Sequence, residues 1–180
     1  MGNRKKVWET LKNVIEDLEK VESSIYFLEK ELREYEEIID KNSLIPKEKF
    51  AKIRIPRLIE RLKYFPDEVL VGVRISFSIA DKPEDLDEKE IIKDVFSYID
   101  SHIRPSDFLF ELDEKTLGIL FTLKDKSHLE LLLKRLENLL LEFKTKIYSS
   151  KRALVNYQVK STVISIDDNA DVVLSKLKEG

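Results

Sequence analysis

The residues best suited to acid–base or metal chemistry gather in one short acidic stretch, formed by Asp81, Glu84, Asp85, Asp87 and Glu88. Two-metal chemistry needs carboxylates that are held rigidly at the end of a strand. This stretch also contains Pro83 and is typical of a loop, so we interpret it as a solvated acidic loop. The two histidines, His102 and His128, lack the local signature of a catalytic triad. They are also too few to favour a zinc site.

A basic stretch with two interleaved tyrosines follows later in the chain. Its cations are Lys144, Lys146, Lys151, Arg152 and Lys160, and the tyrosines are Tyr148 and Tyr157. Such a combination can hold a phosphate or a single nucleic-acid strand. The whole chain, however, balances 32 Lys and Arg against 35 Asp and Glu, with a net charge of -3. We therefore interpret the stretch as a basic strip on the surface and expect no nucleic-acid partner.

Composition excludes several further classes of site. The 180 residues include no cysteine, which removes disulfides, thiolate nucleophiles and thiolate metal sites. Four glycines are too few for a Walker-type loop or a dinucleotide fingerprint, so we expect no cofactor. The Lys- and Glu-rich, cysteine-free usage is typical of a heat-adapted organism. The first 20 residues are charged throughout, and no apolar run reaches the length of a membrane span. We expect a cytoplasmic protein without membrane insertion.

Residues 3–40 show one long helical pattern. Leu and Ile occupy one position of a seven-residue repeat, and Val dominates the other, at Val7, Val14 and Val21. A strict seven-residue apolar repeat is the pattern of a coiled coil. The sequence therefore predicts a homo-oligomer, in the simplest case a dimer, or pairing with another coiled-coil protein. The Leu and Ile seam residues are Leu11, Leu18, Ile25, Leu32 and Ile39.

Acidic residues beside this seam oppose a perfect self-match. In a parallel homodimer several of them would face like charges, which weakens the pairing by a few tenths of a kcal/mol for each exposed contact. The alternative interpretation is a helix packed on its own domain. The sequence leaves the identity of the partner and the parallel or antiparallel orientation open. The residues concerned are Asp17, Glu22, Glu29, Glu31 and Glu36.

The rest of the chain alternates between helix and strand patterns. We expect two domains, residues 1–40 and 41–180, the second an α/β fold whose mixed sheet has both parallel and antiparallel pairs and is flanked by helices. Pro56 should kink or interrupt the first helix of this domain, and a short strand near Ile147 should pair with the last strand. The expected helices cover 47–64, 91–99, 127–143 and 171–178, and the strands cover 69–79, 108–112, 116–123 and 157–166.

The run from Arg104 to Phe121 resembles the GGDEF family, the diguanylate cyclases. That family shows R-x-x-D, a short strand, G-G-D-E-F and a second apolar strand, in this order. Residues 40–46, DKNSLIP, are similar to the family's opening D-x-L-T-G-L-P. Residues 170–174, ADVVL, are similar to its closing A-D-x-A-L, with Lys178 and Gly180 roughly following its A-K-x-x-G. The resemblance covers about residues 40–180 and implies a nucleotidyl-cyclase-like fold.

The departures from the family pattern bear on catalysis. Where the family has G-G-D-E-F, this chain has Asp113, Glu114, Lys115, Thr116 and Leu117. Lys115 replaces a carboxylate that serves the family's metal centre, and the family's other metal ligand belongs to a D-x-D that aligns near Gly72-Val73-Arg74. Residues 69–79 contain no acid. Without these carboxylates Mg²⁺ cannot be held against the phosphates, so the resemblance implies a catalytically inactive member without a metal site.

One family feature is retained. Arg104 and Asp107 match the R-x-x-D of the family's product-inhibition site, and Arg135 lies at about the distance of a further family arginine. The resemblance implies that these three residues bind cyclic di-GMP, the Arg through a phosphate or guanine edge and the Asp through guanine. The alternative is a local ion pair at a turn. We therefore expect an inactive GGDEF-like signalling or scaffold protein. Its rivals are an active cyclase with a divergent loop and a ligand-free coiled-coil adaptor.

Overall fold

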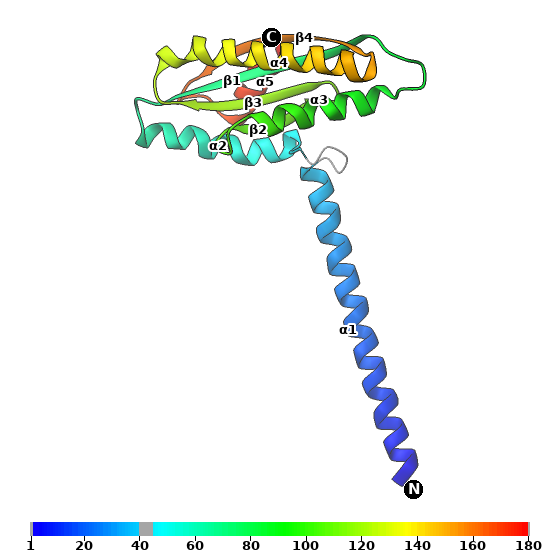
Figure 1. Ribbon diagram of the computed structural model, residues 1–180. Coiled ribbons are helices and arrows are strands. Elements are labelled where there is room, and N and C mark those ends of the chain that lie inside the picture. The colour runs from blue at the N-terminus through cyan, green and yellow to red at the C-terminus, as the bar shows by residue number, and fades with distance from the viewer. Residues whose placement is uncertain (1, 40–44, 180) are drawn as a thin grey trace. The chain divides into compact units, whose positions relative to one another are not determined.

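The structure is a computed structural model that describes residues 2–39 and 45–179, except for the side chain of Glu36. The chain divides into two compact units, one up to Glu37 and one from Ile38 onward. The expected boundary between residues 40 and 41 falls outside the described residues, as do Asp40 to Leu44 of the opening motif and Gly180 of the closing one. Each unit is described by itself below (Figure 1).

The first unit is a single helix, α1, which spans Gly2–Ile38. Beyond Gly2 it contains neither Gly nor Pro, so nothing in the sequence breaks its hydrogen-bond ladder. Its apolar seam residues are about half exposed in the single chain, with Leu18 at 57% and Ile25 at 51%. The helix ends two residues earlier than expected, because the Ile38 carbonyl accepts a hydrogen bond from the Lys47 amide (2.6 Å). Ile39 forms an isolated β-bridge with Pro46 instead of a helical turn.

The second unit begins with α2, Glu48–Tyr64, which runs unbroken through Pro56. The expected interruption at Pro56 is therefore wrong. The helix buries Ala51, Ile55 and Ile59, which repeat every four residues and form one face. This buried face stabilises the helix by tertiary packing, which offsets the cost of the proline.

In the part of the chain that the structure describes, four strands form one sheet in the order β2-β3-β1-β4. They are β1 (Val69–Asp81), β2 (Phe108–Asp113), β3 (Thr116–Leu123) and β4 (Leu154–Ile164). Every pairing in this sheet is antiparallel, so the expected parallel pairs are wrong. The reason is topological. Each helical crossover joins two strands that run in the same direction, but an antiparallel strand lies between them. This is the split β-α-β arrangement of ferredoxin-like sheets.

The crossovers contain α3 (Glu88–His102) and α4 (Leu129–Lys151), the latter preceded by one 3₁₀ turn, η1 (Lys126–His128). The expected strand near Ile147 is wrong, because α4 continues past this buried residue. The helix ends at Lys151 and is followed by Arg152, whose φ of 56° places it in the left-handed region that commonly follows a helix. A last helix, α5, spans Ala170–Glu179.

Two apolar clusters, one on each face of the sheet, make up the core. Alternate residues of β1, among them Val71, Val73 and Ile75, pack against α3 and α4. On the other face, Leu70 and residues of β2 and β3 pack against α2 and α5. The sheet thus lies between two pairs of helices, consistent with Figure 1. Among the described residues, no helix is both long and apolar enough for a membrane span.

Candidate functional site

The turn between β2 and β3 carries the residues that align with G-G-D-E-F. Asp113 accepts a hydrogen bond from the Lys115 amide through Oδ1 (2.8 Å), which closes a local turn. The Lys115 carbonyl accepts from the amide of Phe77 in β1 (2.9 Å). Arg152 is the one non-glycine residue with positive φ in the described part of the chain, so this turn uses no conformation that needs glycine. The turn of this hairpin is stabilised by the Asp113 side chain rather than by glycine.

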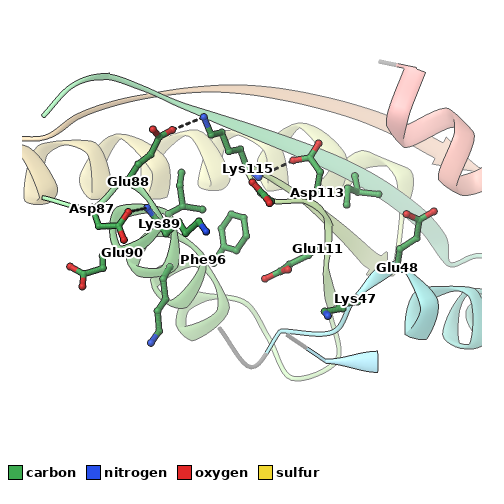
Figure 2. Close-up of a pocket in the computed structure, with 14 residues that line it drawn as sticks. Lys47, Glu48, Asp87, Glu88, Lys89, Glu90, Phe96, Glu111, Asp113 and Lys115 are labelled. Atoms are coloured by element: carbon green, nitrogen blue, oxygen red, sulfur yellow. Dashed lines mark hydrogen bonds and ion pairs between the residues drawn. The ribbon is translucent and has the colours of Figure 1, made fainter. Parts of the chain in front are cut away.

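The Lys115 side chain reaches the start of α3. Its Nζ lies 2.5 Å from Oε1 of Glu88 (Figure 2). The hydrogen bond to Glu88 and the charge of that carboxylate raise the pKa of Lys115 above its ordinary value. Both side chains are substantially exposed, so the pair contributes little to stability. It places a lysine ammonium where the family resemblance would place a metal-binding carboxylate.

The part of β1 that lies beside the turn is uncharged. Ser76 pairs with Thr116, and Phe77 is bonded to Lys115. Gly72, Val73 and Arg74, which align with the family's D-x-D, pair with the middle of β3. The guanidinium of Arg74 donates to the carbonyl of Lys178 (2.9 Å) and so caps the carboxyl end of α5. Thr116 and Leu117 are themselves buried, and Leu117 belongs to the apolar core.

A cleft of about 1000 Å³ lies between the turn, the start of α3 and the start of α2. Figure 2 shows Phe96 and Glu111 near its middle, with Asp87 and Glu88 on one side and Glu48 on the other. Among the described residues, no group of three or more acidic or histidine side chains is arranged to hold a metal ion. Among the described residues, the charged lining consists of seven carboxylates and four lysines: Glu48, Asp87, Glu88, Glu90, Glu111, Asp113, Glu114, Lys47, Lys89, Lys93 and Lys115.

The acidic stretch of the sequence has a structural role at this cleft. Asp87 caps the amino terminus of α3, and its Oδ1 accepts a hydrogen bond from the Lys89 amide (3.0 Å). Asp81 ends β1 and Glu88 begins α3. The stretch therefore ends one element and starts the next, and it lies partly in a loop, as expected.

The Arg104–Asp107 turn joins α3 to β2. The Asp107 carboxylate is 2% exposed and accepts from the Arg104 amide (3.1 Å). It also accepts from the Arg104 guanidinium, through Nε at 3.3 Å and Nη2 at 3.4 Å. Nη2 reaches the carbonyl of Thr122 as well (3.4 Å). The carboxylate and guanidinium thus meet in a forked, two-bond geometry, although both bonds are long.

A second pocket, of about 460 Å³, lies beside this turn, and we call it the Arg104 pocket. Arg104, Asp107 and Arg135 all line it, although Arg135 belongs to α4 and the other two belong to the α3–β2 turn. Lys124, His102 and His128 also line it. Sequence reasoning missed these three, because they come from separate elements and share no motif. The apolar wall consists of Ile103, Phe121, Leu123, Leu131, Leu132, Leu136 and Leu139.

The chemistry of the Arg104 pocket suits an anionic ligand with a flat apolar part. Its volume lies in the range of small-molecule sites. The lining contains three Lys or Arg side chains and one carboxylate, and that carboxylate is already paired with Arg104. The leucines of α4 offer a surface against which a ring can pack.

Most side chains of the basic strip contact other residues of the same domain. Lys144 donates to Asn156 (3.1 Å), and Lys151 pairs with Asp94. Lys146 lies over the ring of Tyr98, 5.3 Å from its centre. These contacts fit the interpretation of the strip as ordinary surface.

Comparison with known proteins supports the fold. No family model and no curated protein sequence matches the chain, whereas solved structures do. A sensory box/GGDEF family protein from Caulobacter crescentus superposes with a TM-score of 0.62 at 11% identity, over 79% of this chain and 94% of that one. The GGDEF domain of DgcB from the same organism, in complex with c-di-GMP, gives 0.56 at 10% identity, over 79% and 84%.

A longer structure of DgcB, which contains its coiled coil and GGDEF domain in complex with c-di-GMP, extends the match. It gives a TM-score of 0.58 at 11% identity, over 90% of this chain and 88% of that one. The larger coverage of this chain includes residues of α1. At these identities the likeness establishes architecture. The chain has the fold of a GGDEF domain, preceded by a long helix that has a counterpart in the coiled-coil form of DgcB.

Proposed function

We propose that this protein is a non-catalytic GGDEF-fold signalling protein that associates through α1 and binds cyclic di-GMP in the Arg104 pocket. The observation that carries the proposal is the convergence of Arg104, Asp107 and Arg135 on one pocket. The resemblance to the GGDEF family implies the same three residues for this ligand. DgcB, which shares the fold, is itself found in complex with c-di-GMP.

The pocket offers a partner for each part of such a ligand. Arg135 and Lys124 supply positive charge for the phosphodiesters. The α4 leucines provide an apolar wall for a guanine ring. Arg104 must turn its guanidinium from Asp107 to the ligand. The carboxylate then accepts from the Watson–Crick edge of guanine while it keeps the bond from the Arg104 amide.

The absence of cyclase activity is proposed from the residues around the β2–β3 turn. The described lining of the nearby cleft has seven carboxylates against four lysines, and this excess of negative charge repels a triphosphate. The ion pair with Glu88 holds the Lys115 ammonium beside the turn. Its positive charge repels a divalent cation there. In-line displacement on GTP would lack the metal-held phosphates that it needs.

Association is proposed from the exposed seam of α1. Its Leu, Ile and Val residues repeat every three and four positions and are about half exposed in the single chain. A second copy of α1 would remove this apolar surface from water.

Isothermal titration calorimetry of the full chain with cyclic di-GMP tests ligand binding. We expect saturable binding that Arg104→Ala abolishes and Arg135→Ala weakens by about tenfold, the value of one charge-assisted hydrogen bond. Arg61→Ala is the matched control, because Arg61 is an exposed arginine paired with Glu68 outside the pocket. Absence of heat at high micromolar ligand, or unchanged affinity in Arg104→Ala, would contradict the proposal.

A ligand-free adaptor is the second candidate, and one observation favours it. The Arg104–Asp107 pair is complete without any ligand, as expected of a turn that is only structural. Calorimetry separates the two candidates, because the adaptor associates through α1 but gives no heat with cyclic di-GMP.

A further inference from the structure

His102 lies at the carboxyl end of α3 and lines the Arg104 pocket. Its Nδ1 atom lies 2.7 Å from the carbonyl oxygen of Tyr98 and 2.9 Å from Oγ of Ser101. The imidazole ring packs on the ring of Tyr98 with centroids 4.2 Å apart. These contacts fix both the position of the ring and the role of one nitrogen.

The protonation of Nδ1 follows from its neighbours. The Ser101 hydroxyl donates its single hydrogen to the Tyr98 carbonyl (2.8 Å). It therefore has no hydrogen for Nδ1, and the carbonyl can only accept. A bare Nδ1 would place its lone pair against that carbonyl oxygen at 2.7 Å. Nδ1 must carry a hydrogen, so in the neutral ring Nε2 is a bare acceptor.

A phosphate oxygen is also an acceptor, so the neutral ring cannot bind one through Nε2. Protonation turns Nε2 into a charged donor, which forms the strong kind of hydrogen bond to an anionic oxygen. In the described part of the chain, no hydrogen bond to Nε2 of His102 is present. We propose that His102 is a further ligand-binding residue of the Arg104 pocket, which contacts a phosphate of the ligand only as imidazolium. This inference rests on the proposed function, and it adds a residue and a proton to that site.

The charged groups around His102 fit this role. The pocket side presents Arg104, Lys124, His128 and Arg135, together with Asp107, whose carboxylate is held by Arg104. On the other side, Tyr98 contacts two residues of α4, Glu142 through its hydroxyl (3.5 Å) and Lys146 through its ring. A bound phosphodiester brings negative charge to the pocket side, and this charge attracts an imidazolium ring. Ligand binding should therefore take up protons, and affinity should rise as pH falls.

Calorimetry of the full chain with cyclic di-GMP between about pH 5.5 and about pH 8 tests this inference. The phosphodiesters stay ionised over this range, so a change in affinity reports on the protein. We expect about three- to tenfold tighter binding at the acidic end. Titrations in two buffers of different ionisation enthalpy should show net proton uptake. His102→Gln should bind with an affinity that is independent of pH, near that of the unchanged protein at the alkaline end.

The outcomes separate this inference from the proposed function. No binding at any pH would overturn the proposed function and, with it, the role of His102. Binding of constant affinity across the range would leave the pocket assignment intact and overturn the role of His102. A pH dependence that persists in His102→Gln, or that disappears only in His128→Gln, would also overturn it. Arg61→Ala should follow the unchanged protein throughout.

Discussion

At the scale of single residues, the Arg104–Asp107 turn has a structural role, and the proposed function adds a binding role to it. The buried carboxylate holds the turn through the Arg104 amide, and the exposed guanidinium, with 57% of its side chain accessible, is the part that can leave. A ligand that replaces the guanidinium need not unfold the turn. The proposed ligand can therefore reach the Asp107 carboxylate once the guanidinium has moved, while the turn stays in place.

Gly118 in β3 provides a residue-scale test of the core. A Cβ built there lies 2.6 Å from Cζ of the buried Phe110 ring. Gly118→Ala should therefore lower the free energy of unfolding by about 1–3 kcal/mol, the usual cost of overpacking. Gly72→Ala is the matched control, because its Cβ meets the flexible end of Leu177 at 3.1 Å, so a smaller loss is expected. Urea denaturation measures both, and equal losses would show that the Phe110 contact is not the cause.

At the scale of elements, the apolar seam of α1 is the basis of the proposed association. Ile25 lies on the seam and Tyr26 beside it, and both are exposed in the single chain. Ile25→Asn should shift the full chain toward monomer in sedimentation equilibrium, because it puts a polar group into the apolar interface. Tyr26→Asn should leave the association state unchanged. Equal effects of the two substitutions, or a monomeric starting protein, would contradict association through the seam.

An ion pair of the segment before α5 should make the free energy of unfolding depend on pH. Asp168 accepts from Lys176 (2.7 Å) and from the Ser165 amide (2.9 Å), and these bonds lower its pKa below the ordinary 3.8. A carboxyl with a lowered folded-state pKa stabilises the fold above 3.8, and this contribution is lost as pH falls through the folded value.

Asp168→Asn should therefore destabilise the protein by about 1 kcal/mol at neutral pH. It should destabilise less in acid, where the unchanged protein loses the same contribution. Urea denaturation at about pH 7 and about pH 3 measures the difference. If Asp168→Asn lowered the free energy of unfolding by the same amount at both pH values, this role of Asp168 would be excluded.

The elements were largely predictable, because each has a local signal. The heptad repeat predicted α1, and β-branched residues predicted β1. Strand direction was not predictable, because two same-direction strands joined by a helix need not be neighbours, and here a third lies between them. Helix α4 runs past the predicted end, because Ile147 packs in the core as a helical residue rather than as a strand. Tertiary packing decided both points.

In the Arg104 pocket, only the residues that match family motifs were predictable from the sequence. Arg104 and Asp107 lie in one four-residue motif, and the structure places Arg135 in the same pocket. Lys124 and His102 reach it from other elements, and nothing in the sequence relates them. The turn at Asp113 lacks the family's glycines, and its conformation depends on a side-chain hydrogen bond that no sequence motif indicates.

At the scale of the whole molecule, the chain joins a long helix with an exposed seam to a domain with the GGDEF fold. The proposed role depends on the domain being a receptor rather than a source of cyclic di-GMP. That distinction rests on the residues around the β2–β3 turn, above all on the lysine that pairs with Glu88.

The most direct test of this account is turnover of GTP. The full chain is incubated with GTP and Mg²⁺, and then with Mn²⁺, and the products are separated by chromatography beside an active diguanylate cyclase as positive control. We predict no cyclic di-GMP above the protein-free blank. Formation of cyclic di-GMP in proportion to the amount of this protein would contradict the account.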